Sequence, residues 1–255
     1  MKHIKKKLIK TDNIETLARY VINEFEITKK PEQKSMTVEQ ALEVAKHVIV
    51  TPTFKYASPT HEILYIPEPD LVVLYFEAAR YYTKSTIEYK NKLFSSLPDK
   101  SKSITQFYSA YTAISSTVLN MFNSLEAAIN RSIPDDYTYE RKEKNGILIH
   151  EKSGIEKDFT FERKVKDVLP DATNKNFVKQ FGHKWDIILK LKSLRDEITH
   201  AKSVSTAEYS YYENLYTQAL NFDALPALGA VRDFINFYQH GLIEECGCGN
   251  TDTDF

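Results

Sequence analysis

The feature that most constrains the fold is a long helical repeat of apolar residues in the middle of the chain. From Ile104 the apolar positions follow at spacings of 3, 4, 3, 4, 4, 3 and 4, through Phe107, Tyr111, Ile114, Val118, Phe122, Leu125 and Ile129. This spacing places them on one face of an α-helix, which Pro134 then closes. About 30 residues make a rod of roughly 45 Å. Such a helix predicts a helical bundle.

The composition also favours a mainly α chain. Only 7 of the 255 residues are glycine, whereas Tyr and Phe number 16 and 14, and average glycine usage is about 7%. An all-β chain needs many Gly-bearing hairpins, and a Rossmann or P-loop enzyme needs a glycine-rich phosphate loop. The sequence contains no GxGxxG, GxxxxGK[ST], GxSxG or HExxH motif. These enzyme classes therefore lose support.

Charge and cysteine content indicate the compartment. The net charge is −1, so the overall charge of the chain does not indicate nucleic acid as a partner. The two cysteines, Cys246 and Cys248, form no disulfide framework and lack the second ligand pair of a zinc site, so no metal or cofactor is predicted. No apolar run is long enough to span a bilayer, and the lysines near Met1 precede polar residues where a signal peptide has its apolar stretch. We expect a cytoplasmic protein without membrane contact.

The first hundred residues, 1–100, are predicted to form an extra helical N-terminal region. Helical spacing is present in Ile14–Phe25 and in Thr37–Val48. Four prolines in Thr51–Pro69 predict a connector with a short extended piece. A helix from Asp70 to about Phe94 follows, and the polar segment Ser95–Ser103 predicts a domain boundary.

The second domain is predicted to span 101–243. Within about 137–161 the period changes to nearly two around Asn145-Gly146, which predicts an inserted β-hairpin. Further helices are expected over Glu162–Val168, Asn176–Ile198, Thr206–Asn221 and Asp223–Leu242. The last two are separated by almost nothing, which favours antiparallel neighbours. The tail 244–255 has no periodicity and is expected to be disordered.

One short segment carries the candidate chemistry. LRDEITHAK places Arg195 and Asp196 before His200, at the predicted C-terminal end of a helix. Together with the apolar run Trp185–Leu194 and the long helix ending FNSLEAAINRSI, it resembles the HEPN superfamily (higher eukaryotes and prokaryotes nucleotide-binding domain) with its Arg-polar-x3-His signature. The resemblance covers about 101–242. The hairpin and the N-terminal region depart from the minimal family pattern.

This resemblance implies a function and a mode of assembly. It implies a metal-independent endoribonuclease that acts as a homodimer, with two copies of the motif in one cleft, in the setting of a toxin–antitoxin pair, phage defence or a stress response. RNA is then the substrate, and an antitoxin or regulatory protein is a separate partner. Cleavage needs a base, an acid and a cation, and His200, with an ordinary pKa near 6.5, and Arg195 supply such groups. Asp196 is the expected orienting group for His200.

Other interpretations of the same residues stay open. Arg195 borders the apolar stripe of its helix, so it is also consistent with an ordinary snorkelling arginine, and His200 with an ordinary helix-terminal residue. The alternative function is a non-catalytic HEPN-like module that binds a nucleotide or a protein and dimerises. Glu126 and Asn130, four residues apart on the long helix, are further candidates to line the substrate cleft, or else belong to its solvated side.

Overall fold

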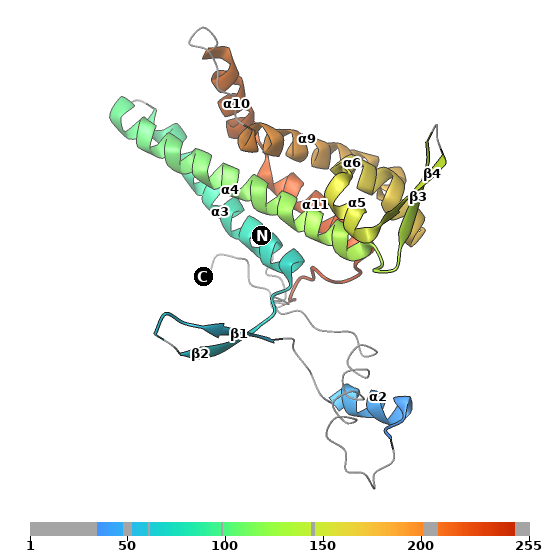
Figure 1. The fold of residues 1–255 in the computed structure, drawn as a ribbon. Coiled ribbons are helices and arrows are strands. Elements are labelled where there is room, and N and C mark those ends of the chain that lie inside the picture. Colours follow the sequence, from blue (N-terminus) through green and yellow to red (C-terminus); the bar gives the residue numbers. More distant parts are fainter. Residues whose placement is uncertain are drawn as a thin grey trace. The chain divides into compact units, whose positions relative to one another are not determined.

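The computed structural model describes residues 35–47, 53–60, 62–97, 99–143, 146–200 and 209–247 (Figure 1). The chain divides into two compact units, and the division lies between Asp70 and Leu71. The boundary predicted near residue 100 is therefore corrected, because the helix before it belongs to the same unit as the helix after it. The predicted helix Ile14–Phe25 lies outside the described residues.

The N-terminal unit contains a capped helix and a hairpin. Helix α2 (Val38–His47) begins with a capping box: the backbone N–H of Gln40 donates to Thr37 Oγ1 (3.3 Å), and the backbone N–H of Thr37 donates to Gln40 Oε1 (3.0 Å). Strands β1 (Thr53–Ala57) and β2 (Ile63–Pro67) pair antiparallel. The connector predicted over Thr51–Pro69 is thus a hairpin. Pro67 is compatible with it because it ends an edge strand, where a missing N–H is tolerated.

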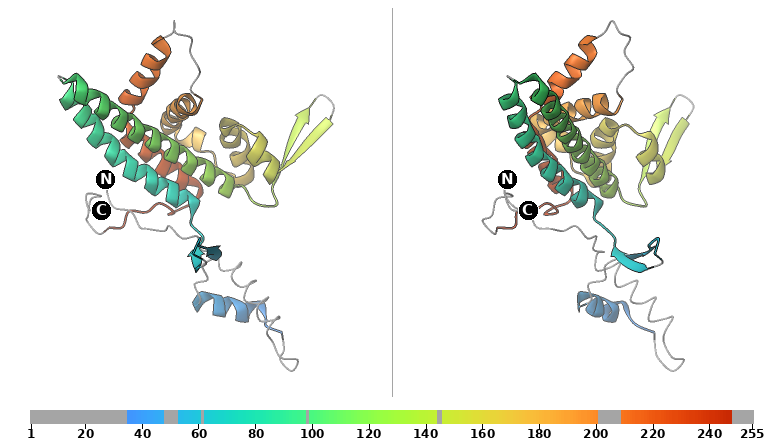
Figure 2. Two further views of the ribbon diagram at one scale, coloured as in Figure 1. Left: turned by 60° about the vertical axis from the view of Figure 1, so that its left-hand side comes forward. Right: turned by 90° about the vertical axis from the view of Figure 1, so that its left-hand side faces the viewer.

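The second unit is built on two long helices that lie side by side (Figure 2). Helix α3 (Leu71–Ser96) and helix α4 (Lys100–Ser132) confirm the two helices predicted there. Two buried hydrogen bonds join them: one between the Thr86 and Thr117 hydroxyls (3.1 Å) and one from Ser124 Oγ to the Val72 carbonyl (2.8 Å).

Helix α4 is the centre of the core. The predicted stripe is buried at Ile114, Val118, Leu125 and Ile129, each at most 1% exposed. Helices α9 (Gly182–Thr199) and α11 (Ala224–Tyr238) pack on it, as does α10 (Tyr209–Asn221). The mainly α, bundle-like prediction is thereby confirmed. Helix α10 has its main contacts with α4 and α9, and α11 has its own with α3, α4 and α9, so the two do not form the antiparallel pair expected from their short connection.

The predicted hairpin is present as β3 (Thr138–Glu143) and β4 (Gly146–Glu151), and it projects from the helices in both views of Figure 2. Gly146 has a φ of 139°, a conformation that suits glycine. The hairpin ends ten residues before the predicted limit at Phe161, because helix α5 (Lys152–Asp158) follows β4 directly.

The chain stays helical through Pro170, where the sequence predicted a stop. Helix α6 (Phe161–Arg163) leads into a π-helical turn, η1 (Lys164–Val168), and then into helix α7 (Leu169–Thr173). Within this turn the Leu169 N–H donates to the Lys164 carbonyl, five residues back. A proline ring collides with the carbonyl four residues before it in a regular α-helix, and a widened turn relieves that contact.

The C-terminal part differs from expectation at two points. The helix predicted over Asn176–Ile198 is divided at Phe181 into α8 (Phe177–Gln180) and α9. The residue just before the predicted disordered tail is held against α11: Asn236 exchanges two hydrogen bonds with the backbone of Ile243 (2.8 and 2.9 Å). Glu245 lies 3.4 Å from Arg232, and residues 248–255 are outside the described part.

Candidate functional site

Arg195 projects from α9 onto an aromatic side chain of α4. Its guanidinium carbon lies 3.7 Å from the ring centroid of Phe122, which is 1% exposed. The Phe122 ring lies 4.8 Å from that of Phe161, and Phe161 stacks on Trp185 at 5.8 Å. The flat guanidinium therefore covers one end of a series of rings, a contact that fixes its orientation.

The polar edge of Arg195 meets two carboxylates. Its Nη1 lies 3.0 Å from Asp196 Oδ1, and its Nη2 lies 4.0 Å from Glu126 Oε1 of α4. Its Nε is buried and has no hydrogen-bond partner. The structure thus brings together three of the five candidate residues, Arg195, Asp196 and Glu126, and leaves the buried Nε of Arg195 without a hydrogen-bond partner.

The carboxylate of Asp196 pairs with cations and not with the His200 ring. Its second oxygen, Oδ2, accepts a hydrogen bond from Lys192 Nζ at 2.8 Å, and Lys192 also lies 3.3 Å from Glu162. The hydrogen bond to Asp196 raises the pKa of Lys192 above its ordinary value. A row of alternating charges therefore runs along this side of α9, and Asp196 orients Arg195 in this state of the protein.

Asn130 accepts a hydrogen bond from a buried lysine close to these residues. Lys164, the first residue of the π-helical turn, is 5% exposed, and its Nζ donates to the Glu156 carbonyl (2.7 Å) and to Asn130 Oδ1 (3.3 Å). Burial lowers the pKa of Lys164, while the charges of Glu126 and Glu156 act in the opposite direction. Glu126 thus interacts electrostatically with both Lys164 and Arg195.

His200 caps the C-terminal end of α9. Its backbone N–H donates to the Asp196 carbonyl at 2.9 Å, and its side chain is exposed. The Thr199 hydroxyl donates to the Arg195 carbonyl at 2.8 Å, which satisfies another terminal carbonyl. Among the described residues none hydrogen-bonds the His200 ring.

Two of these neighbours had no signal in the sequence analysis. In the sequence, Phe122 is one more member of the apolar stripe of the long helix. Lys164 is one of several charged residues in the segment FERKVKD. Their contacts with Arg195 and Asn130 depend on how α4, η1 and α9 pack. A stacking ring can be sought on any helix that faces a motif arginine, but a single sequence does not identify it.

Protein-family models, curated proteins and solved structures were compared with this chain, and none matches it. Within the described ranges no helix has the length and apolar character needed to cross a membrane. The same ranges contain no group of three or more His, Cys, Asp or Glu side chains placed to hold a metal ion, and Cys248 lies outside them.

Proposed function

We propose that this protein is a metal-independent endoribonuclease of HEPN type that acts as a homodimer. The observation that carries the proposal is the different state of the two motif residues. Arg195 is held rigidly on Phe122 with its Nε unused, while the His200 ring, five residues later, is exposed and has no described hydrogen-bond partner. A fixed guanidinium and an exposed imidazole on one helix are the kinds of group that phosphate chemistry requires, one to bind the phosphate and one to move a proton.

Each group has a defined role in cleavage. One His200 removes the proton of a ribose 2′-hydroxyl, and the oxygen attacks the adjacent phosphorus. The bond to the 5′-oxygen breaks as the His200 of the second copy donates a proton to it, which gives a 2′,3′-cyclic phosphate and a 5′-hydroxyl. Arg195 binds the phosphate oxygens as negative charge develops on them. The requirement for both a base and an acid is the reason for two copies.

A second candidate, a non-catalytic HEPN-like binding and dimerisation module, is favoured by one specific observation. Asp196 and Glu126 lie 3.0 and 4.0 Å from the guanidinium of Arg195, so its charge is already balanced within the chain. A phosphate has to compete with these carboxylates.

The test is cleavage of a mixed single-stranded and structured RNA pool in excess EDTA. His200→Ala removes an exposed side chain, so it leaves the fold intact, and it is expected to lower the cleavage rate by about 10²–10⁴. His183→Ala is the matched control, because His183 is also exposed and lies about 25 Å away at the start of α9. Arg195→Lys keeps the charge but loses the planar fork, and is expected to lower the rate at least about tenfold.

The outcomes separate the two functions. Cleavage by the wild type and by the His183 variant, with cyclic phosphate ends and loss in the His200 variant, supports the nuclease. RNA that stays intact with every variant, while sedimentation shows equal dimers, contradicts it and supports the binding module. Equal cleavage by the wild type and the His200 variant places the chemistry elsewhere.

A further inference from the structure

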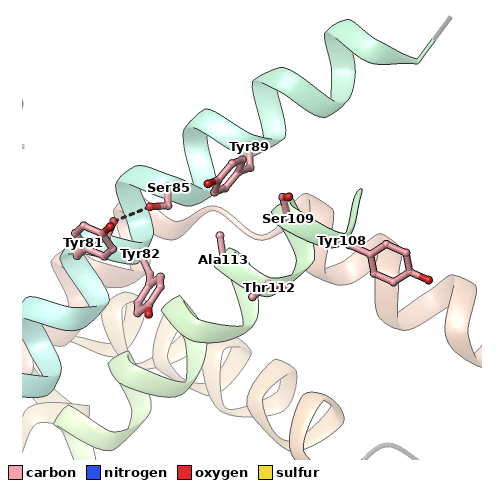
Figure 3. A pocket seen from close by; sticks show the side chains of 8 residues that line it. All are labelled: Tyr81, Tyr82, Ser85, Tyr89, Tyr108, Ser109, Thr112 and Ala113. Carbon is pink, nitrogen blue, oxygen red and sulfur yellow. Dashed lines mark hydrogen bonds between the residues drawn. The ribbon is translucent and has the colours of Figure 1, made fainter. Parts of the chain in front are cut away.

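A tyrosine-rich groove lies on the surface between α3 and α4, with a volume of about 390 Å³ (Figure 3). Four phenol rings and several small side chains line it: Tyr81, Tyr82, Ser85 and Tyr89 from α3, and Tyr108, Ser109, Thr112 and Ala113 from α4. No lining residue carries a charge at neutral pH. In Figure 3 the Tyr108 ring projects outward at one end of the groove.

Two rings of the groove are exposed to solvent, and three of its hydroxyls have no hydrogen-bond partner among the described residues. Tyr108 is 66% exposed and Tyr81 is 55% exposed, far more than rings that fill a core. Within the described part of the chain, no hydrogen bond is made by the hydroxyls of Tyr82, Tyr89 and Ser109. A planar ring with polar groups on its edge matches both properties, since its face stacks on a phenol and its edge meets hydroxyl groups. Nucleobases have this combination.

The groove is aligned with the candidate site along one helix face. Tyr108 lies eighteen residues before Glu126, and Thr112 lies eighteen residues before Asn130, which in each case is five full turns of α4. Members of each pair therefore share a face, about 27 Å apart. Asn123, between them, is exposed. That face of α4 is exposed at Tyr108 and Thr112 and partly exposed at Ser115, Leu119 and Glu126, so it runs from the groove to the carboxylate that lies 4.0 Å from Arg195.

We infer that the tyrosine groove binds an unpaired base of single-stranded RNA whose chain continues to the Arg195 and His200 site. This inference rests on the proposed function and deepens it, because it names the substrate as single-stranded RNA that extends several nucleotides from the cut. Single-strand binders commonly cover about 4–16 nucleotides, so the separation is within reach of one bound strand. Lys92, which is ion-paired with Glu88 one turn earlier on α3, has its Nζ 5.3 Å from the Tyr89 ring centroid, so a cation lies beside the groove.

The experiment measures binding without cleavage. The probe is a labelled single-stranded DNA of about 12 nucleotides, which has no 2′-hydroxyl and is not cut by this chemistry, but stacks its bases in the same way. Replacement of both Tyr81 and Tyr108 by Leu is expected to raise the Kd about 5- to 150-fold, the factor for one lost stacking contact, at one fixed salt concentration. Replacement of both by Phe keeps the rings and is expected to leave the Kd within about threefold.

Controls keep the result specific. Tyr212→Leu changes an exposed tyrosine of α10 outside the groove and is expected to leave the Kd unchanged. A duplex of the same sequence, whose bases are already stacked, is expected to bind the wild type no more tightly than it binds the Leu variant. Circular dichroism of each variant confirms its helix content.

The inference and the proposed function fail in different ways. If the Leu variant binds the single strand as tightly as wild type, the groove is not a base site, whether or not the protein cleaves RNA. If binding depends on the tyrosines but wild type leaves RNA intact in EDTA, the groove stands as a nucleic-acid site and the nuclease proposal falls. If the Leu and Phe variants lose binding equally, stacking is also refuted, because the loss then comes from the hydroxyls that both variants lack.

Discussion

The stacking of Arg195 on Phe122 has a measurable energy. The guanidinium carbon is 3.7 Å from the ring centroid, and the Arg195 side chain is 21% exposed, so the pair is largely shielded from water. A cation–π contact contributes about 0.5–2 kcal/mol in this range of exposure. Phe122→Leu also removes the ring pair with Phe161, worth about 0.5–1.5 kcal/mol. The single substitution is therefore expected to lower the free energy of unfolding by about 1–3.5 kcal/mol.

A double-mutant cycle isolates the cation–π part. Arg195→Met keeps a flexible, unbranched apolar side chain but removes the charged guanidinium, and it is combined with Phe122→Leu. Unfolding in urea is followed by the fluorescence of Trp185, the one tryptophan of the chain, which is 4% exposed and stacks on Phe161. We expect a coupling energy of about 0.5–2 kcal/mol.

The control cycle pairs Arg195→Met with Phe177→Leu. Phe177 is also fully buried, but it packs with Phe181, Phe234 and Phe237 at the far end of α9. These two substitutions are expected to add within about 0.3–0.5 kcal/mol, as distant sites do. If the Phe122 cycle is equally additive, Arg195 is not held by the ring, and the rigid placement of the motif arginine is refuted.

Three further predictions concern the same unit. Thr86→Val leaves the buried Thr117 hydroxyl without its partner and should lower the free energy of unfolding by about 1–3 kcal/mol, whereas the double valine variant should recover most of this loss in urea titrations. Burial raises the pKa of Tyr238 to about 12, so between about pH 10 and 12 the unfolded chain loses this proton while the folded protein keeps it. The free energy of unfolding should therefore fall across this range by at most about 1.4 kcal/mol per pH unit, and the fall should be smaller in Tyr238→Phe. Lys184→Met breaks a 2.7 Å ion pair with Asp233 whose side chains are 37% and 29% exposed, and it should cost less than about 1 kcal/mol and lose its effect at high salt.

The helices of the second unit could largely be predicted because their signals are local. The spacing of apolar residues from Ile104 to Ile129 defines α4, and Asn145-Gly146 marks the turn of the β3–β4 hairpin. The β1–β2 hairpin was missed because five-residue strands bounded by prolines resemble a connector. Pro170 suggested a helix end because the rule for proline assumes regular α geometry, and the sequence does not show a π turn.

The candidate site could be predicted only in part, for a similar reason. In the sequence, Asp196 directly follows Arg195, and Glu126 belongs to the predicted long helix. Packing of α4 on α9 then brings Glu126 to 4.0 Å from Arg195. Which partner each polar group selects is decided by tertiary packing. Asn130 accepts from Lys164 and Asp196 binds Lys192, and neither pairing follows from sequence separation. The catalytic roles of these residues stay predictions for the cleavage assay.

The α3–α4 pair also sets an order of folding. It is the most extensive helix pair of the described chain, and a connection of only three residues joins its members. Closing so short a loop costs little entropy, and contacts that are local in sequence form early. Helix α9 starts about fifty residues after α4 ends, so its docking is a late step. We expect substitutions between α3 and α4 to slow folding and those between α4 and α9 to speed unfolding. On a ribosome, the scaffold emerges before the segment that carries Arg195 and His200 has been made.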